Sequence, residues 1–124
     1  MDKNELEERT KRFALTVIRF VSGMPRTREA DVIGRQLLRA ATSIGANYRE
    51  ANRAESRADF IHKVAIVEKE AAETQYWLDL CLEAGFGDRS SCEALLKESG
   101  ELLAIFTTIG RTAKKRVRNS QTAG

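Results

Sequence analysis

Arginine is the residue type through which this sequence could engage a phosphate or a carboxylate group. It occurs 14 times against 7 lysines, and its planar guanidinium binds such groups through two parallel hydrogen bonds. Several arginines between residues 28 and 53 would share one side of a helix, within an arc of about 80° at 100° per residue. They are Arg28, Arg35, Arg39, Arg49 and Arg53. This spacing predicts a basic face that could follow a nucleic-acid backbone.

Two further groups of cations extend that prediction. The first precedes the basic face and consists of Arg9, Arg12 and Arg19; the second lies near the C-terminus and consists of Arg111, Lys114, Lys115, Arg116 and Arg118. No aromatic residue is interleaved with the arginines of the face, so we expect contacts to the backbone that tolerate any base sequence. The alternative is that the arginines are solvated or pair with acidic residues of another helix, and that the terminal cations match the negative end of a helix dipole.

The two halves of the chain carry opposite charge. Residues 9–57 have a balance of +7 and residues 58–110 a balance of −6, whereas residues 111–124 add five positive charges and no negative one. The whole chain has a formal net charge of +3. Such segregation suits either nucleic-acid binding or ion pairing between the two halves.

Catalytic and metal chemistry are not expected. His62 is the single histidine and lacks a serine or cysteine partner at a useful spacing. The glutamates that follow it do not form the Glu-x-x-His pattern of a di-metal bundle; they are Glu68, Glu70 and Glu73. Cys81 and Cys92 lack the close spacing of zinc ligands and are expected to be buried, reduced thiols. We therefore predict no enzyme, no catalytic residues, no cofactor and no metal.

The elements that position these residues are predicted from apolar spacing and from helix caps. Glycine and proline at 23 and 25 end the first segment, Gly85 ends the third, and Ser-x-x-acid patterns at 56–59 and 90–93 begin the third and fourth. The expected helices cover about 3–22, 27–53, 57–84 and 91–117, within one domain of residues 1–118, and residues 119–124 are expected to form a disordered tail. Short connections between long helices predict an all-α, antiparallel, up-down-up-down four-helix bundle.

Each expected helix carries an apolar stripe for the core. In the first helix it consists of Leu6, Thr10, Phe13, Val17 and Phe20, and in the second of Ile33, Leu37, Ala40, Ile44 and Tyr48. In the third it consists of Phe60, Val64, Val67, Ala71, Thr74, Leu78 and Cys81, and in the fourth of Cys92, Leu95 or Leu96, Ser99, Leu102 or Leu103, Phe106, Ile109 and Ala113. A stripe of mostly small residues, formed by Gly34, Leu38, Ala41 and Gly45, predicts close approach by a neighbouring helix.

The third helix has a second face that predicts contact between subunits. Its members are Ile66, Glu70, Glu73, Tyr76, Trp77 and Leu80. One stripe suffices for a monomeric bundle, and tryptophan and tyrosine are typical anchors of interfaces, so we expect Trp77 to be the main anchor. The alternative is a wide stripe within the core of one chain.

Several motifs resemble a known family. Residues 36–51, which read Gln-Leu-Leu-Arg-Ala-Ala-Thr-Ser-Ile-Gly-Ala-Asn-Tyr-Arg-Glu-Ala, together with Phe13-Ala14, residues 60–63 and residues 69–78, are similar to the bacterial four-helix-bundle proteins also called 23S rRNA intervening-sequence proteins. The similarity is to their Asn-Tyr-Arg-Glu-Ala branch. It implies a bundle that assembles into a homopentameric ring or barrel, without established catalytic residues. It also implies distant similarity to the accessory protein of diversity-generating retroelements, a basic pentamer that engages a reverse transcriptase and its RNA.

These observations leave two hypotheses for the function. The first is an oligomeric helical bundle that binds RNA or DNA through its arginine faces. The second is an adaptor for a protein such as a reverse transcriptase or another polymerase, whose arginines form salt bridges between subunits. In both, the partners include further copies of the chain. No apolar run is long enough for a membrane span and no signal peptide is visible, so we expect no membrane association and a cytoplasmic location.

Overall fold

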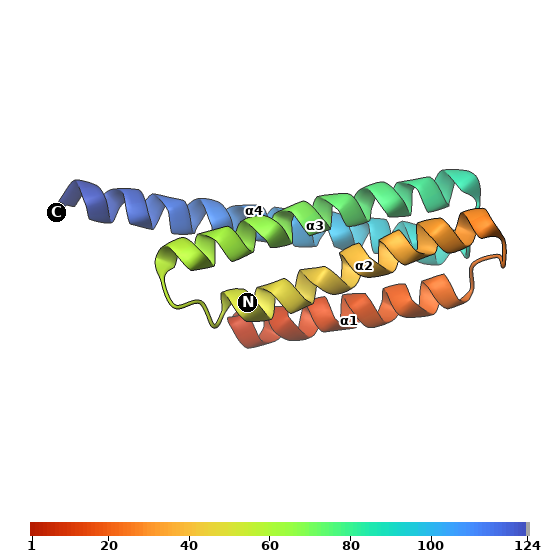
Figure 1. Cartoon of the computed structure of the whole chain (residues 1–124), viewed down its shortest axis with the longest axis horizontal. Helices are drawn as coiled ribbons and strands as arrows, with labels where there is room; N and C mark the ends of the chain where they lie inside the picture. The colour runs from red at the N-terminus through yellow and green to blue at the C-terminus, as the bar shows by residue number, and fades with distance from the viewer. Residues whose placement is uncertain (124) are drawn as a thin grey trace.

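The computed structural model describes residues 1–123, and in that part of the chain it contains four helices and no strand. The helices are α1 (Lys3–Ser22), α2 (Arg28–Ala51), α3 (Arg57–Ala84) and α4 (Arg89–Ala123). The predicted all-α fold with four helices is confirmed. The helices lie along a common long direction, and their connections alternate between the two ends of the molecule (Figure 1). Helices α1 and α3 each contact both α2 and α4, and the contact between α1 and α4 is the least extensive.

Local capping explains where most helices begin and end. The side-chain oxygens of Asp2, Thr27 and Ser56 each accept a hydrogen bond from the backbone N–H three residues later, which satisfies a donor that the first turn leaves free. Helix α3 ends at Gly85, whose φ of 73° lies in the left-handed region that a side chain would disfavour. The predicted bounds of α1 and α3 agree with the structure, while α2 ends two residues before the expected position 53.

Both predicted ends of the fourth helix need correction. The helix begins at Arg89 because Asp88, rather than Ser90, caps it: Asp88 Oδ2 accepts hydrogen bonds from the backbone N–H and the hydroxyl of Ser91, at 2.9 and 2.7 Å. These bonds lower the pKa of the Asp88 carboxyl. At the other end α4 continues to Ala123, since no glycine or proline interrupts residues 111–123. Residues 119–123 of the expected disordered tail are therefore helical, and the prediction for Gly124 lies outside the described residues.

The core follows the predicted stripes with few exceptions. All members of the α1 stripe are buried, as are those of α3 from Val64 to Cys81. Phe60 is only half-buried, because α2 ends before it can cover the first turn of α3. Ile33 is also half-buried. In α4 the core side chains are Leu95 and Leu102, whereas their neighbours at 96 and 103 are half-buried.

Two glycines of α2 allow α1 to pack closely, as the stripe of small residues predicts. A Cβ atom on Gly45 would lie 3.1 Å from Oγ1 and 3.4 Å from Cβ of Thr10. A Cβ atom on Gly34 would lie 3.2 Å from Cγ1 of Val21. Both glycines thus mark places where a side chain would push the first two helices apart.

Candidate nucleic-acid interface

The arginine at the centre of the predicted basic face is bound by α3 of the same chain. Arg39 donates to Glu70 Oε2 at 3.1 Å and to Glu73 Oε1 at 2.5 Å. The hydrogen bond from Arg39 is the main reason that the pKa of Glu73 is lowered, and the same bond raises the pKa of Arg39. For Arg39 the alternative of pairing with the acidic third helix is confirmed.

Arg9 is similarly committed, to α4. Its Nε and one terminal nitrogen each donate to a different oxygen of Glu98 at 2.7 Å, and the same terminal nitrogen lies 3.4 Å from Glu101 Oε1. The side chain of Arg9 is 20% exposed and that of Glu98 30% exposed. The bond to Glu98 raises the pKa of the Arg9 guanidinium. This two-pronged ion pair joins α1 and α4, whose contact is the least extensive of those between neighbouring helices.

The remaining arginines of the predicted face form weaker pairs or none. Arg35 and Arg28 each pair with a carboxylate on their own helix, Asp31 at 2.6 Å and Glu29 at 3.3 Å, and all four side chains are exposed. Arg49 lies 3.7 Å from Glu7 of α1. Among the predicted binding arginines of α1 and α2, Arg12, Arg19 and Arg53 are exposed and make no ion pair within residues 1–123. The predicted face therefore does not offer five uncommitted guanidiniums.

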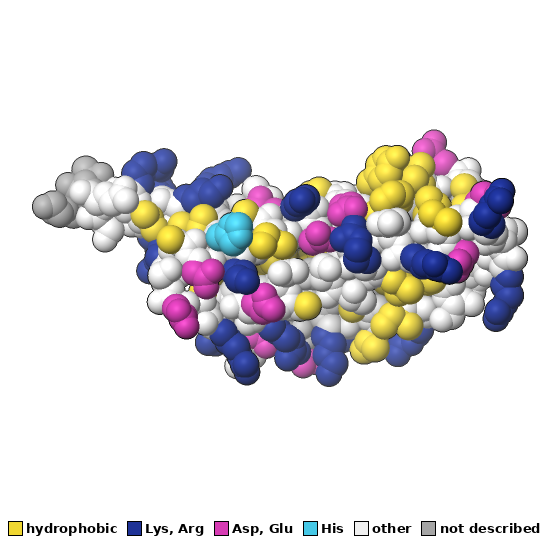
Figure 2. Space-filling model, viewed as in Figure 1, with side chains coloured by type: hydrophobic (Ala, Val, Ile, Leu, Met, Phe, Trp, Pro, Cys, Tyr) yellow, Lys and Arg dark blue, Asp and Glu magenta, His cyan; other side chains and the backbone are white. Residues whose placement is uncertain are grey.

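The basic residues near the C-terminus lie on two opposite sides of α4. Arg111, Lys114, Lys115 and Arg118 are exposed and spaced by three and four, which places them on one face that we call the α4 basic stripe. Arg116 lies on the opposite face. The last turns of α4 project past the ends of α1 and α2 (Figure 1), and Figure 2 shows lysine and arginine side chains gathered on this projection. Residues 111–123 themselves contain no aspartate or glutamate.

The predicted contact face of α3 is partly covered within the chain. Arg39 holds Glu70 and Glu73, and Trp77 is half-buried against the core, with its Nε1 donating to Glu73 Oε1 at 3.4 Å. Ile66 and Leu80 are also half-buried. Tyr76 is 57% exposed and meets the Trp77 ring edge to face, with centroids 5.0 Å apart. Figure 2 shows hydrophobic side chains gathered over the C-terminal half of α3.

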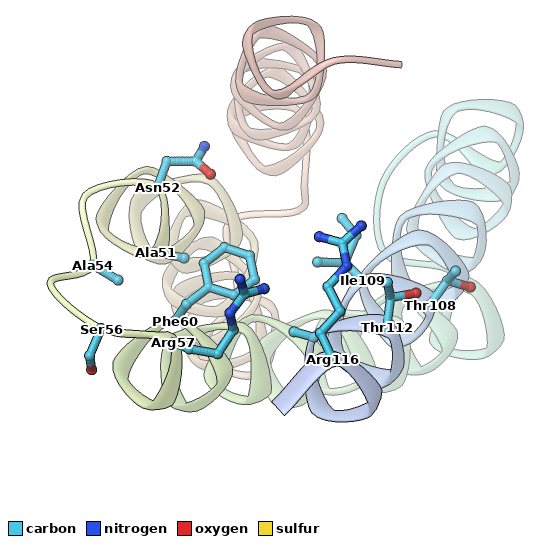
Figure 3. Close-up of a pocket in the computed structure, with 11 residues that line it drawn as sticks. Ala51, Asn52, Ala54, Ser56, Arg57, Phe60, Thr108, Ile109, Thr112 and Arg116 are labelled. Atoms are coloured by element: carbon cyan, nitrogen blue, oxygen red, sulfur yellow. The ribbon is translucent and has the colours of Figure 1, made fainter. Parts of the chain in front are cut away.

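A cavity that sequence reasoning missed lies where the projection of α4 begins. It has a volume of about 510 Å³ and is bounded by the end of α2, the first turn of α3 and the C-terminal half of α4 (Figure 3). Arg57 and Arg116 both line it. Arg57 was not among the predicted binding residues, because no periodicity connects two positions so far apart in the chain. The only available signal was its place directly after the Ser56 cap.

Within residues 1–123 no three histidine, cysteine, aspartate or glutamate side chains come close enough together to hold a metal ion. Over the same stretch, none of the helices combines the length and apolarity needed to cross a membrane. Both cysteines are buried; burial raises the pKa of Cys81 to about 11 and also raises that of Cys92.

Comparison with known proteins decides the family. The sequence model of the 23S rRNA-intervening sequence protein family matches residues 2–108. The chain belongs to this family. A crystal structure of a family relative, a protein with unknown function from the S23 ribosomal protein family of Bacteroides thetaiotaomicron VPI-5482, is 36% identical to it, with a TM-score of 0.79. The similarity covers 90% of this chain and 99% of the relative. No curated protein matches the chain.

The family match stops shortly before the α4 basic stripe. It covers α1 to α3 and α4 as far as residue 108, whereas the stripe begins at Arg111 and the cavity takes Ile109, Thr112, Ala113 and Arg116 from beyond the match. The function of this relative is unknown. This end of the molecule therefore lies beyond the part of the chain that matches the family model.

Proposed function

We propose that this family member is a non-enzymatic, oligomeric helical bundle in the cytoplasm that binds the backbone of RNA or DNA without strong sequence preference. The observation that carries the proposal is the α4 basic stripe, formed by Arg111, Lys114, Lys115 and Arg118 on a helix end that projects from the bundle. Several exposed cations on one face attract phosphates and release their counterions.

The ion pairs of the bundle explain why this stripe, rather than α2, is the main surface. Arg9 and Arg39 are each bound by two carboxylates, so a phosphate would have to replace bonds that join helices. The unpaired cations Arg12, Arg19 and Arg53 add to the long-range attraction without such a cost. The opposite charges of the two halves of the chain are therefore used mainly in ion pairs between helices.

Oligomerisation would lengthen the binding track. The stripe on one chain spans about 10 Å of helix at 1.5 Å per residue, which is enough for only a few phosphates. Several copies in one assembly would bind a strand with higher avidity. We propose the homopentameric ring that the family resemblance implies, built from bundles in up-down-up-down order. The alternating connections in Figure 1 support that order.

The decisive experiment compares two double variants that remove the same charge. Lys114→Gln/Lys115→Gln alters the basic stripe, while Lys69→Gln/Lys97→Gln removes two exposed lysines from the acidic part of the chain. Fluorescence anisotropy with a short labelled RNA should show that only the first variant weakens binding, by about tenfold at 50 mM salt, and lowers the slope of affinity against salt by about 1.5. Equal effects of the two variants, or no binding by the parent protein at low salt, would refute the proposal.

A second candidate is favoured by the exposed Tyr76 beside Trp77. An adaptor would use this apolar patch to hold a protein such as a reverse transcriptase or another polymerase, and aromatic side chains of this kind often anchor interfaces. Its arginines would pair between subunits, but Arg39 finds Glu70 and Glu73 within its own chain, which weakens that part of the hypothesis. An adaptor of this kind would show no change in RNA affinity with either lysine variant.

A further inference from the structure

The cavity between α2, α3 and α4 brings together two arginines that make no ion pair within residues 1–123. Arg57 stands at the first position of α3 and Arg116 in the projecting part of α4. In Figure 3 both side chains rise from their helices into the space that separates α2 from α4. No aspartate or glutamate lines the cavity. Two guanidiniums on opposite walls, without a carboxylate between them, form a place where an anion with several oxygens is favoured.

The other lining residues are suited to a larger group than an inorganic anion. The half-buried ring of Phe60 and the side chain of Ile109 form apolar walls, and Thr108 and Thr112 of α4 also line the cavity. The volume of about 510 Å³ falls within the usual range for small-molecule sites, about 300–1,000 Å³. An aromatic ring next to two arginines is the combination that binds a base and its phosphate in single-stranded nucleic acids.

A second cavity of similar size differs from the first in its charged and aromatic lining residues. It lies at the opposite end of α2, has a volume of about 530 Å³ and is lined by three arginines, Arg26, Arg28 and Arg35. However, the carboxylate of Asp31 also lines it and binds Arg35 at 2.6 Å, and no aromatic residue is present. An anion there would meet a negative charge, and a base would find no ring.

We infer that the cavity between α2, α3 and α4 binds one nucleotide of a single-stranded RNA or DNA, with its phosphate between Arg57 and Arg116 and its base against Phe60. The inference rests on the proposed function and specifies it: the α4 basic stripe, on the opposite side of the same helix, holds neighbouring phosphates, while the cavity selects strands whose bases are free. Duplexes keep their bases stacked and would reach only the stripe.

The test uses the full chain with two labelled probes, a short oligouridylate and an RNA duplex, in fluorescence anisotropy. Phe60→Leu keeps an apolar side chain but removes the ring, and should weaken binding of the single strand about tenfold while leaving duplex binding unchanged. Arg57→Gln/Arg116→Gln should weaken single-strand binding by more than the matched control Arg26→Gln/Arg28→Gln, which alters the second cavity. Circular dichroism checks that each variant is folded; because Arg57 and Arg116 are exposed, that variant remains informative if Phe60→Leu unfolds.

A titration with free ligands separates this inference from the proposed function. Uridine 5′-monophosphate should shift the NMR signals of residues around Arg57 and Arg116 and of the Phe60 ring, and inorganic phosphate alone should shift the arginines but not the ring. If the NMR signals of the Phe60 ring shift but the protein binds no RNA strand, the nucleotide site is supported and the proposed function is refuted. Unshifted signals, equal losses for single strand and duplex, or equal competition by a polyglutamate peptide would overturn the inference.

Discussion

The carboxylate of Glu98 holds the guanidinium of Arg9 by two hydrogen bonds of 2.7 Å. Both side chains are less than one third exposed, so solvent screens this pair less than a surface ion pair. Cavities lie on either side of it along the line between α1 and α4: one involves Phe13 and Leu95, the other Leu6 and Ile105. The pair therefore carries an unusual share of the contact between these helices.

Glu98→Gln should consequently destabilise the bundle. The amide can accept only one of the two hydrogen bonds and removes the negative charge, which should lower the free energy of unfolding by about 1–2 kcal/mol. Glu101→Gln is the matched control, because Glu101 is 53% exposed and lies 3.4 Å from Arg9, and its effect should stay below about 0.5 kcal/mol. Urea denaturation followed by circular dichroism measures both. Indistinguishable midpoints for the two variants would contradict the assignment.

At the scale of the helix, close contact between two helices depends on the positions of glycines, which carry no side chain. Thr10 is fully buried and its hydroxyl donates to the carbonyl of Glu7 at 2.9 Å, so it cannot easily turn away from the backbone of Gly45. Gly100 of α4 faces a different kind of neighbour, since a Cβ atom there would meet only the flexible end of Gln75, at 3.2 Å. Substitution by alanine should therefore change the stability of the protein in opposite directions at Gly45 and Gly100.

Gly100→Ala should stabilise the protein by up to about 1 kcal/mol, the usual difference in helix propensity between the two residues. Gly45→Ala gains the same propensity but forces α1 away from α2, and should destabilise the protein by about 1–3 kcal/mol, as overpacked cores do. Thermal unfolding of the two variants provides the comparison. A higher melting temperature for Gly45→Ala than for the parent would show that the two helices can separate without loss.

The elements themselves could largely be read from the sequence. Leu6, Phe13 and Val17 were predicted correctly, because a helix covered on one side has a single apolar stripe. The prediction that Phe60 is a core residue is wrong, since periodicity shows which side of a helix faces inward but not how far the opposite helix extends. The start of α4 was misplaced because Asp88 competes with Ser90 as a cap, and sequence alone ranks them similarly.

The candidate site was harder to predict than the fold. Charge counts identify basic and acidic stretches, but the partner of Arg9 is decided by which helices adjoin, 89 residues apart. Likewise, Arg57 and Arg116 share a cavity only because α4 continues past the end of α2. Sequence spacing describes one helix at a time, whereas both arrangements depend on how different helices pack together.

For the molecule as a whole, the exposed part of the α3 face bears on assembly. Tyr76 contributes little to the core because it is 57% exposed, while Trp77 both packs on the core and borders the exposed patch. Tyr76 therefore separates the two interpretations of this face more cleanly than Trp77 does, since its replacement should leave the single chain intact.

Tyr76→Glu should shift the protein from oligomer to monomer without changing its helicity, because a carboxylate is costly to bury in an apolar interface. Trp77→Ala should weaken the oligomer as well, by about 2–4 kcal/mol if the indole is an interface anchor, and should also lower the melting temperature. Sedimentation velocity and circular dichroism on both variants measure these effects. An unchanged sedimentation coefficient for Tyr76→Glu would contradict the proposal that this face of α3 forms a subunit contact.

Because the chain is synthesised from its N-terminus, the ion pairs between helices can form only in a certain order. The cationic stretch 9–57 is made before any carboxylate of α3 or α4, and residues 58–110 follow over about 3–10 s at 5–20 residues per second. Arg39 meets Glu70 and Glu73 early in that interval, whereas Arg9 must wait until Glu98 has emerged. The side of the bundle between α1 and α4 is therefore the last to close on a growing chain.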